Sequence, residues 1–305
     1  MSGQAQPPTY PRLDAMGESA ILVSLGHGVS YRLNDRVLAL ADVLRRRTLK
    51  AVLDIVPAYA SLLIRFDLNV VTLDEVTNWI SECLPLGRVL GERPIRTLKV
   101  PVAYGGEFGP DLETVATESN LSPEEAASLH YERVYRVYFL GFMPGFPYMG
   151  DLAPRLRVPR LATPRMRVPA GSVAIASEQT GIYPLNSPGG WRILGRTAIP
   201  VWNPHDEEPA YFRAGDTVRF QPVPEVMSEE GGPRKLPPGG AGTFIIEAQR
   251  GLATIQDCGR PGLGHLGVCA GGSFDRLSAE VVNALVGNPS DAPVLEMALG
   301  GPQLR

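Results

Sequence analysis

Residues 163–197, TPRMRVPAGSVAIASEQTGIYPLNSPGGWRILGRT, decide the fold of the centre of this chain. Short apolar runs alternate there with prolines and glycines, which interrupt strands and form tight turns. The same pattern begins near residue 134 and continues to Phe220. Short strands at such regular spacing are typical of a small β-barrel or sandwich. We therefore expect a β-barrel domain over residues 101–222.

The first hundred residues follow a different pattern, in which candidate strands and helices alternate. Apolar residues at helical spacing predict helices over residues 33–44 and 76–83, and Thr72–Glu75 forms a capping box before the second helix. Strands are predicted at 19–25, 52–56, 62–66 and 98–102. This β-α-β-β-α-β order is that of a ferredoxin-like domain. We expect residues 1–100 to form this domain, with a core of its own.

A linker and a short final segment follow the predicted barrel. Residues 223–242 have almost no apolar periodicity and are rich in proline and glycine, which predicts a linker. Strands at 243–248 and 252–255 and a helix over 275–286 are expected after it. About sixty residues bury too little surface for an independent core. We therefore interpret residues 243–305 as the incomplete start of a further domain.

Composition and charge exclude several functional classes. A formal net charge of -3 argues against nucleic acid as the main partner, because backbone phosphates require a basic surface. The three cysteines form no C-x-x-C pair, which is typical of reduced thiols in a cytoplasm. No apolar run reaches 18 residues, so no membrane span is expected, and the first residues are not those of a signal peptide.

The familiar cofactor motifs are absent. The sequence contains no G-x-x-x-x-G-K-[ST] loop for nucleotide phosphates, no G-x-S-x-G nucleophile motif and no dinucleotide fingerprint after a strand. The four histidines are scattered without the spacing of metal ligands. We expect this chain to bind no metal and no cofactor, so that any ATP would be bound by another polypeptide.

The densest aromatic segment is residues 139–150, FLGFMPGFPYMG. Phe142, Phe146 and Tyr148 stand there among three glycines and two prolines, which make the backbone stiff and irregular. Stiff loops that carry aromatic rings suit the wall of a ligand site. The alternative is an aromatic corner packed on the barrel's own core, and composition alone favours that alternative.

Two further segments offer polar groups for a small ligand. Arg165 and Arg167 alternate along a predicted strand, so one of them faces any given side, and we prefer Arg165 as the cation for a carboxylate. The second segment, residues 179–191, offers neutral hydrogen-bonding side chains and two adjacent glycines, which let a backbone approach a ligand closely. The expected ligand contacts there are Gln179, Thr180, Tyr183, Asn186, Gly189 and Gly190. Solvated arginines and a turn-rich hairpin with satisfied polar groups are the structural alternatives.

A possible acid/base group involves His130, which follows a short predicted helix. Glu107 and Asp111, in the glycine-rich loop before that helix, are its candidate partners. A single histidine is more often structural, and the sequence leaves both interpretations open.

Three runs together resemble a known family. FLGFMPGFPYMGDL, the stretch quoted first and RAGDTVRF are similar to the allophanate hydrolase subunit 1 family, which includes the kinase inhibitor KipI and the B subunit of 5-oxoprolinase. The likeness covers about residues 10–222. The segment that begins ATIQDCGRPG resembles the opening of the allophanate hydrolase subunit 2 family, which includes the C subunit of 5-oxoprolinase. The resemblance implies an α+β chain: a ferredoxin-like domain, a cyclophilin-like β-barrel and part of a second barrel.

The resemblance also implies a function within a larger enzyme. Our first hypothesis is a B-type component, fused to a C-type one, of an ATP-dependent 5-oxoprolinase that hydrolyses 5-oxo-L-proline to L-glutamate. Its partners would be a protein like the A subunit of that enzyme, which would bind the ATP, and the rest of the C-type domain. One alternative is a carboxyltransferase component of a urea carboxylase or allophanate hydrolase-type system. Another is a KipI-like inhibitor of a sensor histidine kinase.

Overall fold

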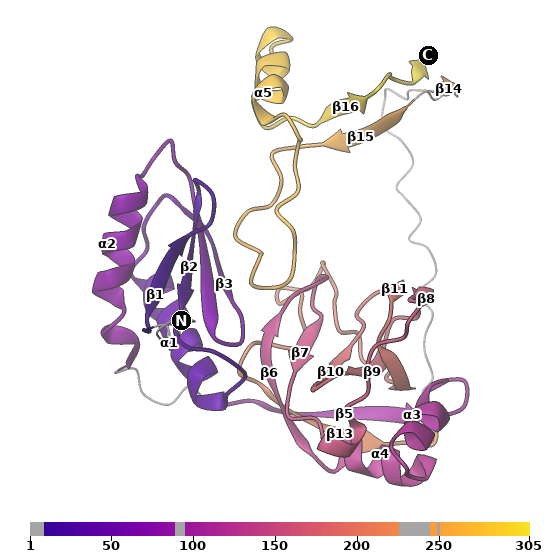
Figure 1. Ribbon diagram of the computed structural model, residues 1–305. Coiled ribbons are helices and arrows are strands. Elements are labelled where there is room, and N and C mark those ends of the chain that lie inside the picture. Colours follow the sequence, from indigo (N-terminus) through magenta and orange to yellow (C-terminus); the bar gives the residue numbers. More distant parts are fainter. Residues whose placement is uncertain (1–8, 89–94, 226–244, 249–250) are drawn as a thin grey trace, which may run out of the picture. The chain divides into compact units, whose positions relative to one another are not determined.

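The computed structural model describes residues 9–88, 95–225, 245–248 and 251–305. The chain divides into two compact units, the first of which contains residues 1–228 together with Gly262–Val268. The second contains residues 229–261 and 269–305. The described part of the first unit holds an N-terminal sheet with two helices and a closed β-barrel, an α+β arrangement (Figure 1). The linker predicted at 223–242 lies outside the described residues from position 226 onward.

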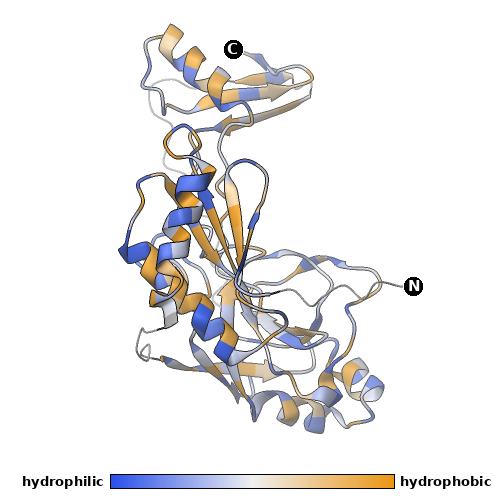
Figure 2. Ribbon diagram, turned by 60° about the vertical axis from the view of Figure 1, so that its left-hand side comes forward, coloured by the Kyte–Doolittle hydropathy of each residue, from blue (hydrophilic) through white to orange (hydrophobic). Residues whose placement is uncertain are grey.

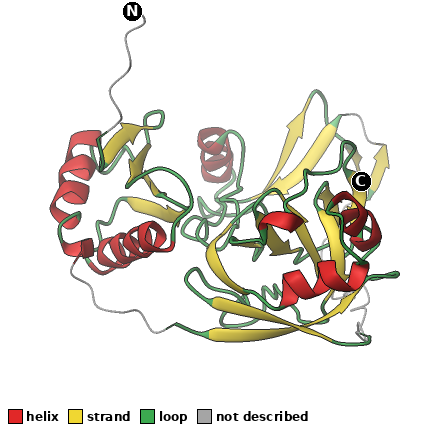
Figure 3. Ribbon diagram, turned by 60° about the horizontal axis from the view of Figure 1, so that its bottom comes forward, coloured by secondary structure: helices red, strands yellow, loops and turns green. Residues whose placement is uncertain are grey.

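The N-terminal sheet is antiparallel, and its strand order is β1-β2-β4-β3. Its strands are β1 (Arg12–Ala15), β2 (Ala20–Ser24), β3 (Val52–Pro57) and β4 (Ser61–Phe66). Helices α1 (Tyr31–Arg46) and α2 (Leu73–Cys83) lie on one side of it (Figure 3), and the short helix η1 (Leu86–Arg88) follows them. The predicted capping box forms at Thr72, whose side chain accepts from the backbone N–H of Glu75. Buried valines and leucines of α1 pack on the sheet.

The strand expected at 98–102 belongs to the barrel, so the predicted β-α-β-β-α-β order of residues 1–100 is wrong. This strand, β5 (Thr97–Tyr104), pairs in parallel with β13 (Thr217–Pro222) along six residue pairs. Val100 and Val102 are fully buried in the barrel core. An apolar run predicts a strand but not the sheet that the strand joins. The short strand β1, which was not expected, occupies the edge of the N-terminal sheet instead.

Seven strands close the barrel in the order β10-β7-β6-β13-β5-β12-β9. Besides β5 and β13 these are β6 (Val134–Leu140), β7 (Pro147–Met149), β9 (Ser172–Ala176), β10 (Gln179–Ile182) and β12 (Arg192–Arg196). Closure pairs both edges of the sheet, which removes the exposed edges that would otherwise invite aggregation. The turn-punctuated sequence quoted first therefore supplies three barrel strands, β9, β10 and β12, as expected from its spacing.

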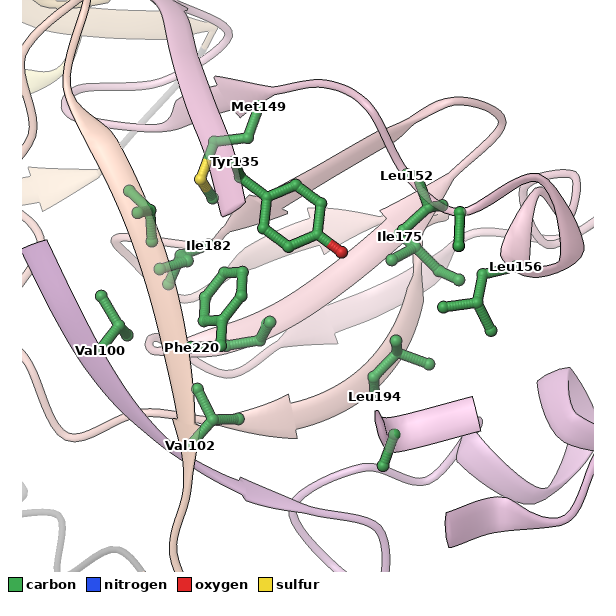
Figure 4. Packing of buried hydrophobic residues seen from close by; sticks show 14 of the residues in the cluster. Val100, Val102, Tyr135, Met149, Leu152, Leu156, Ile175, Ile182, Leu194 and Phe220 are labelled. Carbon is green, nitrogen blue, oxygen red and sulfur yellow. The ribbon is translucent and has the colours of Figure 1, made fainter. Parts of the chain in front are cut away.

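The barrel interior is packed with side chains (Figure 4). Val100, Tyr135, Ile175 and Phe220 belong to this cluster and are at most 3% exposed. Helices α3 (Leu112–Glu118), α4 (Pro123–Tyr131) and η2 (Pro154–Leu156) add residues to the same core. The interior is a core and not a channel.

A two-stranded ribbon and a polar junction lie outside the barrel interior. Strands β8 (Arg165–Val168) and β11 (Ser187–Gly189) form the ribbon. At the junction, the buried amide of Asn34 in α1 donates to the carbonyl of Tyr138 in β6 at 3.2 Å and accepts from Arg136 Nε at 3.1 Å. Arg136 also pairs with Asp35. The hydrogen bonds of Asn34 and the ion pair of Asp35 with Arg136 fix helix α1 to the barrel wall.

The second unit is small and leaves many apolar side chains uncovered. It contains α5 (Arg276–Leu285) and the strand pairs β14 (Ile246–Ala248) with β17 (Gln303–Leu304) and β15 (Leu252–Gln256) with β16 (Val294–Ala298). Figure 2 shows hydrophobic bands along α5. Leu285 is 80% exposed, and Phe274, which is 98% exposed, lines a hollow of about 600 Å³ between α5 and β15–β16. None of the described helices is both long and apolar enough to span a bilayer.

Candidate functional site

The loop between β6 and β7, residues 141–146, carries two phenylalanines in contrasting environments. Phe142 adopts a left-handed backbone with φ of 70°, and Gly145 has φ of 79°. Such a conformation is unfavourable for a bulky residue and indicates that the surrounding fold imposes it. Phe142 is 61% exposed, whereas Phe146 is buried. The loop therefore holds one aromatic ring at the surface by anchoring the next one beneath it.

Phe142 belongs to a continuous series of ring contacts on the outside of the barrel, which we call the aromatic row. Its members are Tyr59, Phe139, Tyr148, Phe146, Trp191, Tyr183 and Phe142. Tyr148 joins the two halves of the row, with its ring centroid 4.6 Å from that of Phe139 and 5.0 Å from that of Phe146. Contacts of this kind contribute about 0.5–1.5 kcal/mol each beyond burial. The row is therefore a rigid, largely buried cluster of rings, of which Phe142 is the exposed member.

Polar groups adjoin the row at two places. Gln179 Nε2 donates to the hydroxyl of Tyr59 at 2.6 Å. The guanidinium carbon of the exposed Arg160 lies 5.9 Å from the centre of the Trp191 ring, within the range of a cation–π contact. Burial raises the pKa of Tyr148, and the positive charge of Arg160 acts in the opposite direction.

The structure places Phe146 and Tyr183 in a small core rather than on an open wall. Both are 1% exposed and pack with Trp191 and with apolar residues of β8, β9 and β12. The rings fill the space between the outer face of the barrel and the β8–β11 ribbon. Of the three aromatics expected to form a ligand wall, Phe142 and Tyr148 reach the surface.

Arg165 is not available as a cation for a ligand, contrary to our expectation. Its guanidinium forms two parallel hydrogen bonds with Asp111, at 2.9 and 2.6 Å. The same carboxylate accepts from the backbone N–H of Ile193 at 2.7 Å. A buried carboxylate requires such compensation, since an unpaired one would be costly. The pair fixes the glycine-rich loop to strands β8 and β12.

His130 lies fully buried in the barrel core, away from the partners predicted for it. Thr180 Oγ1 donates to the carbonyl of Ala174, so it accepts from His130 Nε2 at 2.9 Å. His130 Nδ1 then accepts from the hydroxyl of Tyr104 at 2.8 Å. Burial lowers the pKa of His130 to about 3, so the ring is neutral. The expected acid/base group of His130 with Glu107 and Asp111 is therefore wrong: Asp111 binds Arg165, and Glu107 is exposed.

The remaining predicted ligand residues are dispersed. Thr180 is buried beside His130, and Asn186 Oδ1 accepts from the backbone N–H of Ala170. Gly189 lies in β11, where a Cβ would stand 2.4 Å from the Tyr183 hydroxyl. Gly190 is partly exposed, and a Cβ there would meet nothing closer than 3.7 Å. Gly189 thus serves close packing on Tyr183.

The aromatic row includes residues that the sequence did not single out. Tyr59 lies in the turn between β3 and β4 and contacts Phe139 through space, 80 positions away in the chain. Arg160 follows a proline in an irregular segment. In the sequence, each is an aromatic or basic residue one or two positions after a proline. This pattern is too common to indicate a functional site.

Gly262–Val268, from beyond the predicted linker, packs behind the 141–146 loop within the first unit. Gly145 N donates to the carbonyl of Leu266 at 2.8 Å, and Leu266 forms a bridge with Leu140. Gly267 approaches so closely that a Cβ would lie 2.6 Å from the carbonyl oxygen of Met143. A hollow of about 390 Å³ between this segment and residues 207–214 is lined by none of the aromatic row. Within the described ranges, no cluster of His, Cys, Asp or Glu side chains suits a metal ion.

Comparisons with known proteins match two separate segments of the chain. A family model described as carboxyltransferase domain, subdomain C and D, matches residues 11–212. A second, carboxyltransferase domain, subdomain A and B, matches residues 266–305. The chain is 37% identical to the 5-oxoprolinase B subunit of Bacillus subtilis (strain 168) over 224 residues, which are 70% of this chain and 93% of that protein.

The final segment and the whole chain have relatives of their own. Forty-nine residues are 45% identical to the 5-oxoprolinase C subunit of Haemophilus influenzae, covering 16% of each protein. The crystal structure of TTHA0988 resembles the chain with a TM-score of 0.79 at 40% identity, over 93% of this chain. The chain spans 56% of the length of that longer protein.

Proposed function

The chain belongs to the carboxyltransferase-domain family, subdomains C and D, and we propose that it works as the B-type component of an ATP-dependent 5-oxoprolinase, joined to the first part of a C-type domain. The observation that carries this proposal is the identity of 37% with a 5-oxoprolinase B subunit across 93% of that protein. The proposal includes a cyclophilin-like fold for the closed barrel.

The proposed reaction opens the lactam of 5-oxo-L-proline to give L-glutamate, with ATP hydrolysis driving the attack on an unreactive amide. This chain carries no phosphate-binding loop motif, so an A-type partner protein supplies nucleotide binding. The aromatic row supplies the surface on which the flat, partly apolar ring of the substrate rests. The rest of a C-type domain covers the apolar residues that the second unit leaves exposed.

The direct test is an assay of glutamate release with purified components. The full chain, an A-type partner protein and a complete C-type domain are combined with 5-oxo-L-proline and ATP. We expect glutamate to form when all components are present, and no glutamate from this chain alone. Release by this chain without partners, or no release by the complete mixture, would contradict the proposal.

Within that assay, Phe142→Ala tests the aromatic row. Phe142 is 61% exposed, so removing its ring costs little stability but removes substrate contact area. We expect KM to rise roughly 5- to 20-fold, which corresponds to about 1–2 kcal/mol of lost contact. Val70→Ala is the matched control, because Val70 is 65% exposed and lies near the N-terminal sheet. Equal kinetics for both variants would remove the row from the substrate site.

A second candidate is favoured by the family model itself, which describes a carboxyltransferase domain. In this case the chain would transfer a carboxyl group between carboxybiotin on a partner and an amide such as urea. The two functions differ in their response to avidin, which sequesters biotin. Amide-dependent turnover that avidin abolishes would favour the carboxyltransferase, and avidin-insensitive glutamate release would favour the 5-oxoprolinase.

A further inference from the structure

The arginines around the aromatic row differ in how their charges are compensated. Arg165 pairs with Asp111, Arg157 with Glu178, and Arg192 with Glu118. Among the residues that the structure describes, no carboxylate lies within ion-pair reach of Arg160. Its exposed guanidinium therefore keeps its hydrogen-bond donors free for a ligand.

The guanidinium of Arg160 is in contact with the aromatic row. Its guanidinium lies over the ring of Trp191, 5.9 Å from the centroid, and Trp191 is itself 5% exposed. Stacking on an aromatic face limits the directions in which the planar fork can point. Less conformational entropy is then lost when the fork engages a ligand.

The Tyr148 hydroxyl is a second potential hydrogen-bond donor at the aromatic row. The Tyr148 ring is fixed between Phe139, Phe146 and Trp191, and its hydroxyl has no hydrogen-bond partner among the described residues. The charge of Arg160 acts on that hydroxyl and on that of Tyr183. A cation and a neutral donor thus both adjoin the aromatic row, beside Trp191 and Tyr148.

We propose that Arg160 binds the carboxylate of the substrate, with the substrate's ring on the aromatic row and the Tyr148 hydroxyl available to the amide oxygen. This inference rests on the proposed function for the identity of the substrate as a lactam carboxylate. A guanidinium fork matches a carboxylate with two parallel hydrogen bonds. Arg160 would thus bind the carboxylate that we expected Arg165 to bind, because Arg165 is already paired with Asp111.

The test compares two ligands that differ by the carboxylate, 5-oxo-L-proline and 2-pyrrolidinone. KM is measured in the assembled complex, and equilibrium binding to the full chain is measured in parallel by calorimetry. Arg160→Ala should weaken binding of 5-oxo-L-proline roughly 10- to 100-fold, the usual effect of losing a charge-assisted hydrogen bond. Binding of 2-pyrrolidinone should change less than about 3-fold, so discrimination between the two ligands falls.

Two further variants distinguish recognition from simple charge. Arg160→Lys keeps the charge but loses the fork, and should recover part of the lost affinity. Arg167→Ala removes another exposed arginine, on β8, and should leave both ligands unaffected. Circular dichroism checks that each variant is folded.

The outcomes separate this inference from the proposed function. Binding that depends on Arg160, without glutamate release by the wild-type complex, would retain the inference and reject the 5-oxoprolinase. Glutamate release with an unchanged KM in Arg160→Ala would retain the function and overturn the inference. No binding of 5-oxo-L-proline to the wild-type chain or complex, or a loss of affinity in Arg167→Ala instead, would also overturn it.

Discussion

His130→Gln tests whether the buried histidine is a structural part of the barrel core. The His130 ring is fully buried, stacks on Phe220 at 4.6 Å between centroids, and bridges Tyr104 and Thr180. Glutamine retains one donor and one acceptor but cannot take up a proton near neutral pH. The substitution therefore removes the titration while keeping part of the hydrogen bonding.

The magnitude follows from the pKa of His130, which burial lowers from 6.5 to about 3. At a pH between these two pKa values, the imidazole is protonated in the unfolded chain but neutral in the folded chain. The stability contributed by the neutral imidazole is therefore complete above pH 6.5 and is lost as the pH falls toward 3. From pH 7 to pH 5 the wild-type chain should lose about 2 kcal/mol from this residue. At pH 7 the variant should be less stable by about 1–3 kcal/mol, because its hydrogen bonds fit less well.

Urea unfolding at pH 7, 6 and 5, followed by tryptophan fluorescence, measures the free energy of unfolding of both proteins. The pKa of His265 is also lowered by burial, but His265 is present in both proteins and its contribution cancels in the comparison. We expect the wild-type chain to lose about 2 kcal/mol more than the variant between pH 7 and pH 5. If both lose the same amount, His130 is not held neutral in the core and the structural assignment is wrong.

Three other substitutions test contacts that hold the site in place. Asp111→Ala should destabilise the first unit by about 2–4 kcal/mol in urea unfolding, because it leaves Arg165 and a backbone N–H without their partner; an effect below about 0.5 kcal/mol, on the scale of ordinary surface changes, would contradict this. Gly267→Ala should loosen the 141–146 loop, since its Cβ would meet the carbonyl of Met143 at 2.6 Å, and faster hydrogen exchange in that loop is the expected result. Asn34→Ala should cost about 2–4 kcal/mol by removing three hydrogen bonds of the buried Asn34 amide, and an unchanged urea midpoint would refute that role.

Local patterns in the sequence predicted most of the elements. The helical spacing over residues 33–44 and the capping box at Thr72–Glu75 correspond to α1 and α2, and the short-strand pattern that begins near residue 134 starts with β6. These features depend on neighbours within one or two turns, so a single sequence contains the necessary information. The strand β1, RLDA, was not predicted because an alternation over only four residues is too short to be distinctive.

The errors all concern partners that are distant in the chain. Strand β5 was assigned to the N-terminal sheet because its partner β13 lies more than a hundred residues later. Arg165 was taken for a ligand group because nothing in the sequence indicates that Asp111, 54 positions earlier, would neutralise it. Phe146 and Tyr183 have the composition of a ligand wall, but whether such rings face solvent depends on the ribbon that covers them.

The position of Gly262–Val268 bears on why two family segments are joined in one chain. The second family model begins at residue 266, yet this segment is built into the first unit, where Gly264 N donates to Asp54 and Gly145 N to Leu266. The boundary between the families is therefore not the boundary between the physical units. A B-type chain without these residues would lack the support behind the 141–146 loop and the exposed Phe142. Covalent linkage supplies that support at a high effective concentration, whatever the concentration of the protein.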